Sequence, residues 1–135
     1  MSNNKITIAQ DSYDEIIDHC CSELPNEACG IVSGVNNTVI TVWKLKNESK
    51  SENRYFVSKE KVQQIFNNIF NNGENVLGIY HSHPKTSPIP SKFDLMNHPY
   101  QDVKMLIVSL KKKKPVIKSY EIVNQSYYES TLIVN

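Results

Sequence analysis

The nine residues Val76–Pro84, VLGIYHSHP, decide the fold, because an apolar run leads directly into two histidines and a proline. Such a run predicts a buried strand over Val76–Tyr80. On a strand, residues two apart point to the same face about 7 Å from each other, so His81 and His83 would reach one ligand together. Imidazole nitrogens bind zinc at about 2.0–2.1 Å, so the pair indicates a metal site. Taken alone, such a pair is more often a solvated strand end than a metal site.

Further strands are expected on both sides of this run, because short β-branched and aromatic stretches recur between turn residues. Two of them, Ala28–Gly34 and Thr38–Leu45, are separated by Asn36-Asn37 and predict a hairpin. The remaining expected strands are Lys5–Ala9, Tyr55–Val57, Met105–Leu110 and Val116–Val123, with Thr131–Val134 at a sheet edge.

Two longer helices are expected between these strands. Ser12, with Glu15 three residues later, has the form of a capping box, and Pro25 would end the first helix. Ser58 is the expected cap of a second helix, which Asn71-Asn72-Gly73 would stop. Strands interleaved with helices predict an α/β fold in which helices sandwich a mixed β-sheet.

Three segments are predicted to be irregular or exposed. The polar stretch Lys46–Arg54 predicts a loop, and two prolines exclude regular structure from Lys85–Pro90. The four-lysine run Lys111–Lys114 is expected to be a solvated hairpin turn.

Composition limits the classes of function. The chain has 135 residues, which is enough for one domain over residues 1–135. Fifteen basic and 14 acidic residues leave a net charge of +1, so no global field favours nucleic acid or an anionic membrane. The sequence has no apolar run near the ~18 residues of a membrane helix and no secretory signature, so a cytoplasmic location is expected.

The three cysteines do not form a CxxC pair, which argues against a disulfide framework and a cysteine zinc site. Cys20 and Cys21 are expected on the core face of the first helix. Cys29 is expected to be a packing residue and not a nucleophile.

Two carboxylates complete a set around the histidines. Asp94 lies eleven residues after His83, on a loop long enough to fold back, and Ser91-x-x-Asp94 also has the form of a capping box that opens a short helix. Two histidines and a carboxylate are a catalytic zinc set with an open fourth position. Glu27, just before a predicted strand, is the candidate proton shuttle, and its alternative role is an exposed acid at a turn.

The joint pattern resembles the JAMM (MPN+) zinc metalloprotease family. A glutamate, then H-x-H-P, six residues and S-x-x-D are all present here, from Glu27 through His81-Ser82-His83-Pro84 to Ser91-Lys92-Phe93-Asp94. The resemblance implies a JAMM/MPN (cytidine-deaminase-like) fold and one Zn²⁺ per chain. It further implies that the zinc ligands are His81, His83 and Asp94.

The same resemblance implies two catalytic residues. Glu27 matches the carboxylate that assists attack by the zinc-bound water and moves its proton. Ser91 matches the hydroxyl that donates to the oxyanion.

A second resemblance concerns the substrate. Pro25-x-Glu27-x-Cys29-Gly30 is similar to the small prokaryotic branch of the family that acts on ubiquitin-like sulfur-carrier proteins. It implies a peptidase or isopeptidase that cuts after the C-terminal Gly-Gly of a β-grasp carrier protein. A Gly-Gly tail would pair with a strand edge, for which the candidates are Lys46–Val57 and the strand entering His81.

Other readings stay open. RadC-like proteins share H-x-H-P and S-x-x-D, although their loop after H-x-H-P usually contains glycine and Lys85–Pro90 has none. A phage-tail-type JAMM hydrolase and a non-catalytic module that binds ubiquitin-like proteins are further alternatives. A cytidine deaminase is excluded because P-C-x-x-C is missing. The sequence leaves open the physiological substrate, the pathway, the metal in the cell and the oligomeric state.

Overall fold

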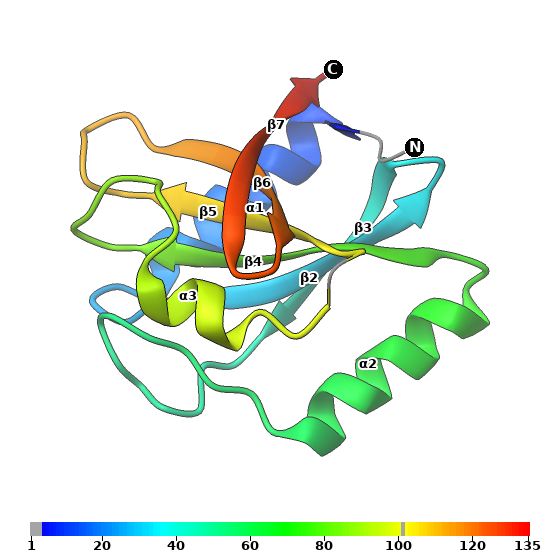
Figure 1. The fold of residues 1–135 in the computed structure, drawn as a ribbon, viewed down its shortest axis with the longest axis horizontal. Helices are drawn as coiled ribbons and strands as arrows, with labels where there is room; N and C mark the ends of the chain where they lie inside the picture. The colour runs from blue at the N-terminus through cyan, green and yellow to red at the C-terminus, as the bar shows by residue number, and fades with distance from the viewer. Residues whose placement is uncertain (1–3, 101) are drawn as a thin grey trace.

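The computed structural model describes residues 4–100 and 102–135, which form seven strands and three helices (Figure 1). The strands are β1 (Lys5–Ile8), β2 (Cys29–Val35), β3 (Thr38–Leu45), β4 (Asn75–His83), β5 (Lys104–Ser109), β6 (Val116–Val123) and β7 (Ser126–Val134). The helices are α1 (Gln10–Ser22), α2 (Lys59–Asn71) and α3 (Lys92–Asn97). None of the helices in these ranges has the length and apolar character that crossing a bilayer requires.

The strands close into a barrel in the order β1-β3-β2-β4-β5-β6-β7. The predicted mixed sheet is confirmed, because β4 pairs antiparallel with β2 and parallel with β5. The edge position expected for Thr131–Val134 is wrong, since β7 pairs with β6 on one side and with β1 on the other. The strand entering His81 is not an edge either, because Cys29 and Ile107 flank His81 in register.

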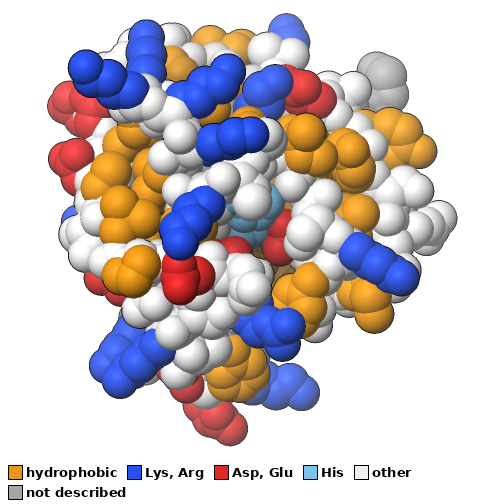
Figure 2. Space-filling model, turned by 90° about the vertical axis from the view of Figure 1, so that its left-hand side faces the viewer, with side chains coloured by type: hydrophobic (Ala, Val, Ile, Leu, Met, Phe, Trp, Pro, Cys, Tyr) orange, Lys and Arg blue, Asp and Glu red, His pale blue; other side chains and the backbone are white. Residues whose placement is uncertain are grey.

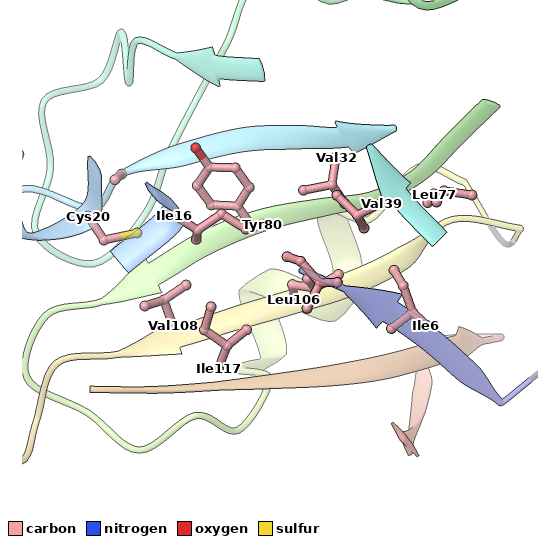
Figure 3. Close-up of a cluster of buried hydrophobic side chains, with 12 residues drawn as sticks. Ile6, Ile16, Cys20, Val32, Val39, Leu77, Tyr80, Leu106, Val108 and Ile117 are labelled. Carbon is pink, nitrogen blue, oxygen red and sulfur yellow. The ribbon is translucent and has the colours of Figure 1, made fainter. Parts of the chain in front are cut away.

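Three buried clusters hold the layers together. The first joins α1 to the strands and includes Ile16, Tyr80 and Leu106, which point toward one another in Figure 3. The second lies under α2, whose buried Ile65 and Ile69 pack with residues of β2 and β4. The third lies on β5 and β6 against Leu95 of α3. In Figure 1, α2 lies below the strands, α3 lies in front of their lower part, and α1 lies behind them.

The start of α1 differs from the prediction that Ser12 caps it. The helix begins at Gln10, its N-cap is Ala9, and no side chain caps it. The Gln10 amide instead donates to the Asn135 carbonyl at 2.9 Å, so a tertiary contact satisfies a donor that a cap would otherwise serve. The predicted core role holds for Cys20, which is buried, and is wrong for Cys21, which is exposed.

Two further local expectations have different outcomes. The strand expected over Tyr55–Val57 is absent, because the Phe56 amide donates to the Asn47 side chain and its carbonyl accepts from Glu48, both within the same loop. The hairpin of β2 and β3 is confirmed, and both turn residues, Asn36 and Asn37, have positive φ as a type I′ turn requires.

Gly30 on β2 makes room for a buried aromatic ring on the neighbouring strand. A Cβ at Gly30 would lie 2.3 Å from ring atoms of Tyr80, which is fully buried. The Tyr80 hydroxyl lies 2.7 Å from His19 Nδ1 on α1, so the ring cannot move without breaking a contact between β4 and α1. The absence of a side chain at position 30 therefore lets the Tyr80 ring pack against β2.

We expect Gly30→Ala to lower the free energy of unfolding by roughly 1–3 kcal/mol, because the added methyl overpacks the core. Urea unfolding measures this. The change should cost less than half as much in a Tyr80→Leu background, where the clashing ring is gone. An equal cost in both backgrounds would show that the clash is not with Tyr80.

Candidate metal centre

The C-terminal end of strand β4 and the first turn of helix α3 bring three ligand atoms together. His81 Nε2 and His83 Nε2 lie 3.2 Å apart, and each lies 3.1 Å from Asp94 Oδ2. All three residues are buried. The trio predicted from the sequence therefore converges on one point, as its spacing along a strand and a returning loop implied.

The size of this triangle suits a metal ion. Ligands bound tetrahedrally at 2.0–2.1 Å lie about 3.4 Å from one another, close to the observed separations. His83 Nδ1 lies 2.8 Å from the Ser87 carbonyl, which only accepts, so Nδ1 carries the proton of the neutral ring. The lone pair of His83 Nε2 then points into the triangle, which is the orientation that a metal-binding histidine needs.

The charges of the trio favour a bound cation. Burial alone would raise the pKa of Asp94, but hydrogen bonds with His81, His83 and the Ser91 amide hold it well below its usual range. Burial would lower the pKa of His83, but in the protonated ring both N–H groups donate, one to Asp94 and one to the Ser87 carbonyl, and these hydrogen bonds raise the pKa. The buried carboxylate thus attracts positive charge to this point, either a proton or a metal ion.

Glu27 lies beside the trio at the entry to β2 and is buried, so the reading of an exposed acid is wrong. Burial raises the pKa of its carboxyl to about 8; the charge of Asp94 adds to the rise and that of His83 opposes it. Its Oε1 atom is buried without a hydrogen-bond partner among the described residues. Such an atom is expected to face a bound ligand or water.

Ser91 and Asp94 are fixed by one capping box at the start of α3. Ser91 Oγ accepts from the Asp94 amide at 3.0 Å, and the Ser91 amide donates to Asp94 Oδ2 at 2.9 Å. The predicted capping box is therefore confirmed. The same two bonds orient the carboxylate toward the histidines and leave the Ser91 hydroxyl proton without an acceptor among the hydrogen bonds of the described residues.

Cys29 is placed as predicted, in the core below the site. It is buried within the cluster under α2, and burial raises the pKa of its thiol to about 12. The nucleophilic thiolate is therefore scarce at neutral pH, which supports packing as its role.

The sequence analysis missed Asn47, a buried hub of the loop after β3. Its amide nitrogen donates to the carbonyls of Glu27 and Arg54, at 2.9 and 3.0 Å. Its oxygen accepts from the amides of Ser49 and Phe56, both at 3.1 Å. An asparagine in a polar loop resembles any solvated turn residue, so no sequence signal distinguished it.

The loop that Asn47 organises contacts the site twice. The Tyr55 ring stacks on His81 at 5.2 Å between centroids. This contact restrains the imidazole, whose Nδ1 has no hydrogen-bond partner among the described residues. The Arg54 guanidinium lies 4.7 Å from the centre of the Phe93 ring, next to Asp94. In Figure 2, the histidines lie at the centre of a hollow with acidic side chains beside them.

Comparison with known proteins was made on the sequence and on the fold. The family described as prokaryotic homologues of the JAB domain matches residues 9–123. The desampylase of Haloferax volcanii is 29% identical over 101 residues, which span 70% of this chain and 73% of that protein.

Two solved structures are similar over 96% of this chain. A protein of Desulfitobacterium hafniense, solved in solution, is 30% identical with a TM-score of 0.87 and is covered over 92% of its length. A JAB1/MPN domain protein of Archaeoglobus fulgidus, covered over 98%, is 23% identical with a TM-score of 0.67, which shows the shared fold.

We expect Asn47→Ala to expose the loop around Glu27, because several groups lose a buried partner. Amide hydrogen exchange at Ser49 and Phe56 should speed up by roughly tenfold or more. The matched control is Ser33→Ala, which removes another polar hub, bonded to Glu74 and Trp43. If the amide hydrogens of Ser49 and Phe56 exchange equally fast in both variants, Asn47 does not specifically stabilise the loop.

Proposed function

Because the chain belongs to the prokaryotic JAB-domain family, we propose that it is a zinc-dependent JAMM peptidase or isopeptidase. Its proposed substrate is a ubiquitin-like, sulfur-carrier type of protein, cut at the amide bond after a C-terminal Gly-Gly. The similarity to a desampylase supports a ubiquitin-like substrate. The observation that carries the proposal is the triangle of His81, His83 and Asp94 with the buried Glu27 carboxyl beside it, whose Oε1 atom has no hydrogen-bond partner among the described residues.

His81, His83 and Asp94 would hold the zinc ion, which when bound supplies a Lewis acid that activates water and polarises a carbonyl group. The capping box and the Ser87 carbonyl keep two of these side chains in place before any ligand arrives. The open side of the triangle leaves room for water and substrate.

Glu27 is the proposed proton carrier. It takes a proton from the attacking water and returns it to the leaving amine, so the bond breaks without a free amide anion. A carboxyl whose pKa is raised to about 8 by burial is suited to both steps near neutral pH.

Ser91 is the proposed donor to the oxyanion. Its Oγ lone pair is used by the Asp94 amide, so the hydroxyl proton is free to point at the carbonyl oxygen of the substrate. That bond strengthens as negative charge develops on the oxygen, and it therefore lowers the barrier more than it tightens ground-state binding.

We expect the purified wild type to hold one zinc ion per chain and His83→Ala to lose it. The reason is that the variant removes one of only three protein ligands. Elemental analysis after gel filtration measures the ratio. His98→Ala is the matched control, since His98 bonds the Val103 carbonyl outside the site and should leave zinc content unchanged. Full occupancy in His83→Ala would reject the ligand set.

The activity is tested with the host's ubiquitin-like β-grasp proteins, each extended by a short peptide past Gly-Gly. We expect the zinc-loaded wild type to release the extension, as seen by mass spectrometry. Glu27→Gln should keep the zinc and lose at least about 10²-fold in kcat. Retained zinc with no cleavage by the wild type would favour a non-catalytic binding module.

We expect Ser91→Ala to lower kcat by about 10²–10³ through loss of the oxyanion donor. The lost cap should also cost about 1 kcal/mol of stability, so thermal melts accompany the kinetics. Ser91→Thr keeps both the acceptor and the donor and should retain most of the activity. A Thr variant as slow as Ala would point to packing at this position instead of the hydroxyl.

A further inference from the structure

We infer that the turn Lys111–Lys114, between β5 and β6, is a docking site for an acidic surface on the folded body of the substrate protein. The inference rests on the proposed function, because it concerns how that substrate is recognised. It differs from the reading of these lysines as a solvated turn with no partner.

The turn is joined directly to the metal-site loop. His83 and Ser109 are partners in register between β4 and β5. One residue later, the Leu110 amide donates to the His83 carbonyl at 3.1 Å, and Ser109 Oγ donates to the Thr86 carbonyl at 2.6 Å. The lysines therefore begin where the strand beside the metal ligands ends, on the rim of the same hollow.

The charge on this turn is unbalanced. All four lysines are exposed, and none forms an ion pair within the described residues. Within the described residues, four lysines elsewhere do have acidic partners: Lys44, Lys85, Lys104 and Lys118. Since the whole chain carries only +1, this positive patch is local. In Figure 2, Lys and Arg side chains gather along the upper edge of the face, above the histidines.

The fold does not explain why the turn consists of lysines. No residue from 111 to 114 has the positive φ that restricts residue choice in tight turns. No lysine side chain of the turn forms a hydrogen bond within the described residues; its one bond is between the Lys111 amide and Ser109 Oγ. Four adjacent like charges repel one another, so a partner of opposite charge accounts for them better than the turn does.

A protein with an acidic surface suits this arrangement better than a nucleic acid. A phosphate backbone is bound by positive charge spread along a groove, whereas here the excess charge is confined to one four-residue turn of a chain that carries only +1 overall. A Gly-Gly tail carries no side-chain charge, so it needs no charged partner inside the hollow. The folded body at the base of the tail, at about 3.3–3.6 Å per extended residue, then lies near the rim.

The test compares the extended β-grasp protein with its isolated tail peptide as substrates of the zinc-loaded enzyme. For the wild type, kcat/KM should be higher for the protein, and this preference should shrink as salt is raised from 50 to 500 mM. Lys112→Glu/Lys113→Glu should lower kcat/KM for the protein by about tenfold, mainly through KM, and leave peptide cleavage unchanged.

The control, Lys59→Glu/Lys61→Glu on the first turn of α2, changes net charge equally and should keep the preference for the protein. An unchanged preference in the Lys112/Lys113 variant, or an equal loss in the control, overturns the docking site while peptide cleavage still upholds the proposed function. If the wild type cleaves neither substrate, both proposals fail.

A single-stranded oligonucleotide at 150 mM salt tests the competing partner. The turn would be assigned to nucleic acid instead if the enzyme bound the oligonucleotide tightly, and if the Lys112/Lys113 variant lost only this binding and cleaved the carrier protein as before.

Discussion

The structure depends on the burial of one carboxylate, Asp94, against two imidazoles. A carboxylate removed from water is costly unless it is paired and hydrogen-bonded, so the fold has to supply partners at the right positions. It does so from two directions: β4 presents His81 and His83 on one face, and the start of α3 presents a backbone amide through the capping box.

The sequence was most informative where a local rule determines the geometry. The i, i+2 spacing of the histidines predicted their common face, and Ser91-x-x-Asp94 predicted the cap, because both depend on neighbours in the chain. It failed where a group elsewhere in the chain, from the backbone or a side chain, takes a hydrogen bond that local structure would otherwise make. Ser12 does not cap α1 because the Asn135 carbonyl meets the Gln10 amide, and 55–57 is not a strand because Asn47 takes the Phe56 amide.

Support for the site comes from a loop without regular structure. Asn47 joins the Glu27 carbonyl to the segment that carries Tyr55 and Arg54. Glu27, the ring against His81 and the cation over Phe93 therefore belong to one hydrogen-bonded unit. Such a unit preorganises the site, since a loop with satisfied buried bonds moves less than its lack of secondary structure would suggest.

The pairing of β1 with β7 has a consequence for how the chain matures. The two strands are parallel and join Lys5 to Thr131, so the barrel closes only between segments made at very different times. Ribosomes add about 5–20 residues per second, and contacts of such long range form late. The strand and helix that carry the histidines and Asp94 leave the ribosome before β7 does. The chain segments that carry His81, His83 and Asp94 are therefore already synthesised when β7 closes the barrel.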